Sequence, residues 1–199
     1  MNATEPADAS VRAFVALKLG PEVREALAAA ERRLQRAPAR VGWVRPENIH
    51  LTLAFLGDIT LSGVGAIAGT LDSIGRHTAP FSFAVEGIGS FGGRRPRVVW
   101  AGIPAPSAGP VIALQKPVAD ALQLLGYRLE DRAFQPHLTL GRVRSSAGAE
   151  ARVRALAELR DARFGQVEAG SVFLMRSQLL SAGPAYSILH EAPLAGNAR

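Results

Sequence analysis

His50 and His137 each begin the same tetrapeptide, His-Leu-Thr-Leu, at two distant places in the chain. Successive side chains of a strand point to opposite faces, so each histidine shares a face with the following threonine, Thr52 or Thr139. An imidazole has a pKa of about 6.5 and can give or take a proton at neutral pH. A threonine hydroxyl can donate a hydrogen bond to a phosphate oxygen. If the two strands face each other across a cleft, these four side chains form the set that opening a cyclic phosphodiester needs.

The pairing of histidine with threonine rarely arises by chance in a chain of this composition. A given histidine has a roughly 3% chance of a threonine two positions later, so two such matches occur in about 0.5% of shuffled chains. The pattern therefore favours a catalytic pair over coincidence. His77 and His190 lack the pattern, and we expect them to be surface or supporting residues.

A metal site is the natural rival reading of two histidines. A catalytic zinc ion usually has three protein ligands, and no His-x-x-x-His pattern or acidic cluster supplies the third. Asp58 follows the first copy of the tetrapeptide, but Arg142 follows the second, and a cation opposes metal binding. We therefore expect catalysis without a metal and without a cofactor.

A second rival is the motif Gly87-x-Gly89-x-x-Gly92, which fits the dinucleotide-binding fingerprint. That fingerprint requires a helix to begin at the glycines. Here the glycines lead through Arg94, Arg95 and Arg97 into a strand, so we predict a bend and a hairpin turn. The arginines could contact RNA phosphates or form a solvated turn, and both readings stay open.

Composition limits the protein classes that remain. A chain of 199 residues suits one well-buried domain. The net charge of +6 comes mainly from arginine, whose planar fork suits phosphate, and it favours an anionic partner such as nucleic acid. The absence of cysteine removes disulfides, thiolate zinc sites and cysteine nucleophiles, and it fits a cytoplasmic protein. No apolar run approaches the roughly 20 residues of a membrane helix.

The order of elements predicts an α+β fold with largely antiparallel sheets. We expect one domain over residues 11–194, with flexible tails at 1–10 and 195–199. The repeated tetrapeptide suggests two related lobes, each presenting one histidine. Strands are predicted over residues 12–19, 43–45, 49–56, 81–88, 98–103, 138–143, 167–180 and 186–194, and helices over 21–37, 62–74, 111–125 and 149–159.

Four segments, residues 12–17, 43–57, 96–100 and 134–142, follow one another in a specific order. Together they resemble the two-histidine phosphoesterases, and specifically the RNA 2′,3′-cyclic phosphodiesterases, also called 2′-5′ RNA ligases. Gly141 is smaller than the residue expected there. The resemblance implies a bilobal fold, with two pseudo-symmetric lobes around a central cleft and helices outside. It also implies hydrolysis of RNA 2′,3′-cyclic phosphate ends to 2′-phosphomonoesters, a step of RNA processing, without a metal.

The resemblance also assigns roles to residues. It implies that His50 is the general acid on the leaving O3′ and that His137 is the general base toward water, whereas the residues by themselves leave this division of roles open. Thr52, Thr139 and Arg142 match phosphate-binding positions. Phe55 matches an aromatic residue that lines the nucleoside pocket. The alternative interpretation, a phenylalanine of the hydrophobic core, fits the sequence nearly as well.

Three other readings remain open at the level of sequence. The protein could add reversible 2′-5′ RNA ligation, could bind RNA ends or nucleotides without turning them over, or could hydrolyse another small cyclic nucleotide. Binding alone does not need both an acid and a base, so the second histidine favours an enzyme. We expect a monomer that does not act at a membrane.

Overall fold

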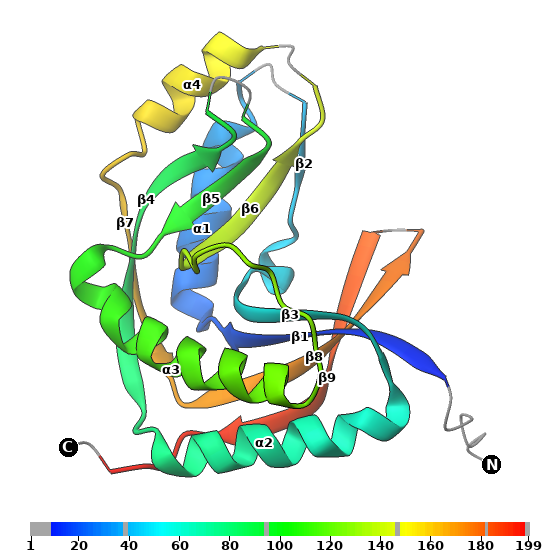
Figure 1. Ribbon diagram of the computed structural model, residues 1–199. Helices are drawn as coiled ribbons and strands as arrows, with labels where there is room; N and C mark the ends of the chain where they lie inside the picture. The colour runs from blue at the N-terminus through cyan, green and yellow to red at the C-terminus, as the bar shows by residue number, and fades with distance from the viewer. Residues whose placement is uncertain (1–8, 38–39, 94–95, 146–147, 182, 198–199) are drawn as a thin grey trace.

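The computed structural model describes residues 9–37, 40–93, 96–145, 148–181 and 183–197. Within them, nine strands form one curled sheet in the order β7-β4-β5-β6-β3-β1-β8-β9, with β2 added beside β6 (Figure 1). The α+β fold with antiparallel pairing is confirmed. The strands are β1 (Ser10–Lys18), β2 (Val41–Trp43), β3 (His50–Thr60), β4 (Phe81–Phe91), β5 (Val98–Gly102), β6 (His137–Val143), β7 (Arg163–Ala169), β8 (Ser171–Leu180) and β9 (Gly183–Pro193).

The sheet consists of two halves that repeat the same arrangement. One half runs outward from the strand of the first histidine as β3-β1-β8-β9, and the other runs outward from the strand of the second as β6-β5-β4-β7. The halves meet where Leu51 of β3 pairs with Leu138 of β6, between the two tetrapeptides. The internal repeat of the sequence is therefore a repeat of structure, and its two copies lie side by side at the junction.

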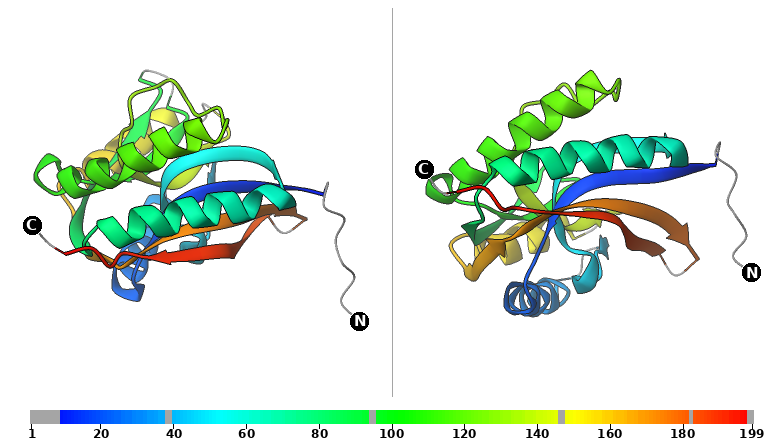
Figure 2. Two further views of the ribbon diagram at one scale, coloured as in Figure 1. Left: turned by 60° about the horizontal axis from the view of Figure 1, so that its bottom comes forward. Right: turned by 90° about the horizontal axis from the view of Figure 1, so that it is seen from below.

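Each half has a helix packed against its outer strands. α1 (Pro21–Leu34) contacts β7, and α2 (Val64–His77) contacts β9 and β8. α3 (Ala105–Leu124) lies against α2, β3 and β4, and α4 (Ala149–Ala157) contacts α1 and β4. Figure 2 shows α2 and α3 side by side along one side of the molecule. No helix in the described ranges is both long and apolar enough to cross a membrane.

The core lies on the face of the sheet opposite the histidines. Leu51, Leu138 and Leu140 are fully buried, and Leu53 is 3% exposed. Each such leucine stabilises the fold by about 1.5–3 kcal/mol relative to an exposed one. Alternate positions of β3 and β6 are thereby fixed inward, and this fixes the histidines and threonines outward.

Some sequence-based boundaries are wrong. The single strand predicted over 167–180 is two strands, because the chain leaves β4 after Ala169 and joins β1 after Ser171. α3 begins at Ala105 and contains Pro110 and Pro117, since its buried face overrides the local preference against proline.

The glycine motif forms a bend within β4. Gly87 has φ +72° at a register shift of β4, so the predicted bend is confirmed and no helix begins there.

The C-terminal end differs from the predicted tail. Ala195 and Gly196 donate backbone hydrogen bonds to the carbonyls of Gly75 and Thr78, so these two residues are held against the end of α2 and are not part of a free tail. Residues 1–8 lie outside the described residues.

Candidate active site

The two tetrapeptides lie next to each other at the junction of the halves. With Leu51 opposite Leu138 in an antiparallel pair, His50 stands opposite Thr139 and His137 stands opposite Thr52. All four are partly exposed, on the face away from the buried leucines. Residues at diagonal positions of such a pair are about 7–8 Å apart, and their Cβ atoms are somewhat closer. We call this surface the two-histidine face.

Each imidazole makes the same kind of hydrogen bond, to the backbone carbonyl two positions before it. Nδ1 of His50 lies 2.7 Å from the carbonyl oxygen of Asn48, and Nδ1 of His137 lies 2.7 Å from the carbonyl oxygen of Gln135. Because a carbonyl can only accept, Nδ1 carries the hydrogen in each ring. Nε2 is thereby left to exchange a proton with a bound molecule in both copies.

A β-bulge follows each tetrapeptide threonine. In the first copy the register passes from Thr52 opposite Ala16 to Ala54 opposite Val15 and skips Leu53. A bulge of this kind reverses which residues face which side. Phe55, five positions after His50, therefore returns to the two-histidine face, where it is 53% exposed.

The second copy repeats this bulge. The register passes from Thr139 opposite Trp100 to Gly141 opposite Val99 and skips Leu140. Arg142, five positions after His137, is exposed and occupies the position equivalent to Phe55. A Cβ on Gly141 would lie 2.6 Å from Val41 of β2, so the close approach of β2 explains the small residue there.

Tyr186 of β9 borders the first histidine. Its ring lies with its centroid 5.3 Å from that of His50, at an interplanar angle of 88°. Burial raises the pKa of Tyr186, and the positive charge of Arg142 opposes this rise in part. Sequence reasoning missed Tyr186, because its residue type and its spacing from the tetrapeptides carry no signal.

His50 lies in an apolar setting. Its ring stacks on Phe14 with centroids 4.6 Å apart. Burial lowers the pKa of His50, and the hydrogen bond to the Asn48 carbonyl opposes this in part. At neutral pH, His50 of the free protein is therefore mainly uncharged.

His137 has a different neighbour. The ring of Phe91 meets it edge-on with centroids 4.9 Å apart, and Phe91 in turn lies 5.3 Å from Trp100. Trp100 rests over Gly89, where a Cβ would come within 2.4 Å of the indole. An aromatic chain from β4 and β5 thus supports the second histidine.

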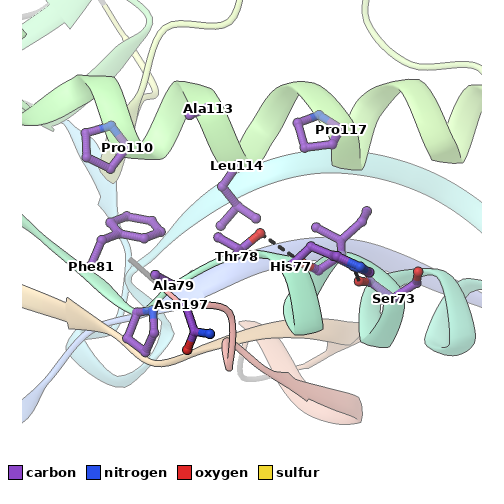
Figure 3. A pocket seen from close by; sticks show the side chains of 12 residues that line it. Ser73, His77, Thr78, Ala79, Phe81, Pro110, Ala113, Leu114, Pro117 and Asn197 are labelled. Carbon is purple, nitrogen blue, oxygen red and sulfur yellow. Dashed lines mark hydrogen bonds between the residues drawn. The ribbon is translucent and has the colours of Figure 1, made fainter. Parts of the chain in front are cut away.

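The other histidines lie elsewhere. His77 lines a groove of about 610 Å³ between α2 and α3, where its Nδ1 lies 2.8 Å from the carbonyl oxygen of Ser73 (Figure 3). His190 lies 2.7 Å from the carboxylate of Asp72 and ties β9 to α2. Each of these two histidines is hydrogen-bonded within the fold, away from the tetrapeptides, in line with the expectation that they are surface or supporting residues.

Of the other charged residues weighed in the sequence, Asp58 and Arg97 are exposed. Arg94 and Arg95 lie outside the described residues. Among the described side chains, no three His, Cys, Asp or Glu residues are grouped so that they could hold a metal ion.

Comparison with known proteins agrees with this architecture. The model of a family described as LigT-like phosphoesterase matches residues 17–100 and residues 102–186, and each stretch holds one tetrapeptide. The RNA 2′,3′-cyclic phosphodiesterase of Methanothermobacter thermautotrophicus is 34% identical over 178 residues, which are 89% of this chain and 95% of that protein. The protein of the same name from Aquifex aeolicus is 33% identical over 190 residues, 94% of this chain and 98% of its own.

Solved structures show the same fold. The protein TT0787 of Thermus thermophilus has a TM-score of 0.79 at 28% identity, over 94% of this chain and all (100%) of that one. E. coli LigT complexed with 3′-AMP has a TM-score of 0.77 at 24% identity, over 94% of this chain and 99% of that one.

Proposed function

Because the chain belongs to the LigT-like phosphoesterase family, we propose that it is a hydrolase that opens the 2′,3′-cyclic phosphate at the end of an RNA. The proposed product is the 2′-phosphomonoester, with His50 and His137 as acid and base. The observation that supports this most is the pair of imidazoles on one face, each with Nδ1 bonded to a backbone carbonyl. Nε2 of each ring is then available for one step of proton transfer.

The chemistry is an in-line displacement at phosphorus. Nε2 of one histidine takes a proton from water while the water oxygen bonds to phosphorus. The bond from phosphorus to O3′ breaks, and Nε2 of the other histidine donates a proton to O3′. The two rings end with exchanged protonation states and reset by exchange with solvent.

The remaining site residues would hold the phosphate. Thr52 and Thr139 stand opposite the two histidines and can donate hydroxyl hydrogen bonds to its non-bridging oxygens. Arg142 adds a charged fork from the same face. Phe55 is exposed there, with its ring centroid 6.2 Å from that of Phe14, and it offers an aromatic surface to the nucleoside.

The lowered pKa of His50 bears on the division of roles. If His50 is the acid, as the family resemblance implies, it must be protonated when O3′ leaves. Its apolar setting favours the neutral ring in the free protein. Binding of an anionic phosphate beside the ring favours protonation, so the acid form would be generated with the substrate in place.

The finer parts of the proposal concern partners. The proposed substrate is an RNA with a cyclic phosphate end or a small cyclic nucleotide. We also predict that the protein is a monomer and acts in the cytoplasm. Reversible 2′-5′ ligation would be the same chemistry with an RNA 5′-hydroxyl in place of water. Sedimentation at working concentration tests the monomer.

The experiment that tests the function uses an oligonucleotide with a 2′,3′-cyclic phosphate end, incubated with the protein in EDTA. We expect one product, resistant to a phosphatase specific for 3′-phosphates, because a fixed acid opposite a fixed base selects one leaving oxygen. Ready release of phosphate, or a mixture of esters, would show that the assigned ribose orientation is wrong. Binding without turnover would favour the RNA-end-binding reading, and activity restored only by zinc or manganese would favour a metal enzyme.

A further inference from the structure

Tyr186 contacts two rings of the site at once. The rings of Phe14 and His50 are nearly parallel, at 25°, and Tyr186 stands across both of them at 76° and 88°. Its centroid lies 5.1 Å from that of Phe14 and 5.3 Å from that of His50. The imidazole is thereby stacked by one aromatic ring and bounded by a second, so its rotation about the side-chain bonds is restricted.

The hairpin that carries Tyr186 is fastened to the segment before His50. Asn48 donates a hydrogen bond from its side-chain amide to the carbonyl of Pro184, at 2.8 Å. The backbone carbonyl of the same Asn48 accepts the hydrogen of His50 Nδ1. One residue therefore joins the β8–β9 hairpin to the imidazole, and Tyr186 lies two positions after Pro184.

Tyr186 is only partly exposed beside the histidine. Burial raises the pKa of its phenol, and the positive charge of Arg142 in β6 partly opposes this rise.

We propose that Tyr186 is a positioning residue, whose ring fixes the orientation of the His50 imidazole. The inference rests on the proposed function for its catalytic meaning. Its physical content, the restraint of one imidazole by one phenol, does not depend on the substrate.

Two substitutions at Tyr186 test the role of the ring. Tyr186→Phe keeps the ring, so it should retain the His50 titration and most of the kcat that a variant without the ring loses. Tyr186→Leu removes the ring, so we expect kcat to fall on the order of 10–100-fold through misplacement of the imidazole. Tyr127→Phe, at the chain's other tyrosine, and Ile188→Ala, on β9, are matched controls that should leave both kcat and KM unchanged.

A spectroscopic readout separates positioning from general damage to the fold. The His50 ring is titrated by NMR and assigned with His50→Gln. In Tyr186→Leu its pKa should move up toward the ordinary value, because water reaches the ring. The other titratable groups beside His50 are Lys18, opposite it in β1, and His137, diagonal to it in β6, and Arg142 of β6 acts electrostatically on Tyr186. None of these three residues is changed in the variant.

The outcomes are distinguishable. Tyr186→Leu with the wild-type kcat and an unmoved His50 titration would overturn the ring's role, and so would Tyr186→Phe if it lost as much kcat as Tyr186→Leu. If Tyr186→Leu does not fold, Tyr186→Met, whose side chain is also not aromatic, tests the same loss of the ring. A wild-type protein inactive on the oligonucleotide would remove the proposed function, while the NMR titration would still decide whether Tyr186 restrains His50.

Discussion

The two halves of the site share one geometry but have different surroundings. Each has a histidine whose Nδ1 is bonded to the carbonyl two positions earlier, and each has a bulge after the threonine. Around His50 lie Phe14 and Tyr186, whereas the described ring neighbour of His137 is Phe91. Repetition of the backbone supplies two equivalent proton carriers, and the differing neighbours make them unequal.

Unequal surroundings are what acid–base catalysis by two identical residues requires. One ring must be protonated when the other is not, so environments that separate their pKa values assign the roles. The bulges add a second asymmetry at equivalent positions, with Phe55 in one half and Arg142 in the other. Under the proposed function, the aromatic ring would serve the nucleoside and the guanidinium would serve the phosphate.

Replacing either histidine should have the largest effect on the rate of the reaction. His50→Ala and His137→Ala should each lower kcat on the order of 10²–10⁴-fold, the usual contribution of a general acid or base. Steady-state hydrolysis of the cyclic-phosphate oligonucleotide measures this, with His77→Ala as the control. A variant of either residue that keeps most of the activity would contradict the two-histidine account.

The equivalent positions after the bulges should respond differently. Arg142→Ala should slow the reaction by roughly 10–100-fold, the worth of a hydrogen bond to a charged group, and should leave the product ester unchanged. A changed product in Arg142→Ala would mean that this residue selects the leaving oxygen.

Phe55→Ala should raise KM for nucleotide substrates with little change in kcat, because the aromatic surface for the nucleoside is lost.

The pH dependence of single-histidine variants sharpens the comparison further. In His137→Ala the remaining activity depends on His50, whose pKa is lowered by burial. If His50 is the acid, kcat/KM falls as pH rises through that lowered pKa, because the active protonated form is lost. If it is the base, kcat/KM rises instead. We expect the fall, measured from about pH 5 to 8.

The smallest effect concerns stability outside the site. Glu31 of α1 is buried, with one carboxylate oxygen unpaired among the described residues, and burial raises its pKa to about 8. The neutral form is favoured on folding, so wild-type stability declines as pH rises from the unfolded pKa toward the folded one. Glu31→Gln should therefore raise Tm more at alkaline pH than at pH 4, without changing activity. Equal shifts at both pH values would contradict this account of Glu31.

The sequence predicts the chemical groups of this site better than their arrangement. The alternation of His, Leu, Thr and Leu is sufficient to place His50 with Thr52 and the leucines in the core, because burial enforces the faces. The face of Phe55 could not be predicted, since it depends on a bulge set by the register against β1.

Long-range contacts explain the other features that the sequence did not predict. Tyr186 reaches His50 only because β9 pairs with β8, which pairs with β1. The division of residues 167–180 depends on a change of partner strand, which leaves no local mark. Such features follow from the assembled sheet, and a single sequence carries little information on them.

The central claim is that both histidines act on one phosphate, and a crystal structure with an RNA 2′-phosphate end bound tests it most directly. We expect Nε2 of His50 and Nε2 of His137 each to lie within about 2.6–3.2 Å of a different oxygen of the same phosphate. The imidazoles themselves should then lie on the order of 5–8 Å apart, allowing each a hydrogen bond to it. Imidazoles separated by more than ~12 Å, or a phosphate that touches only one of them, would contradict the claim.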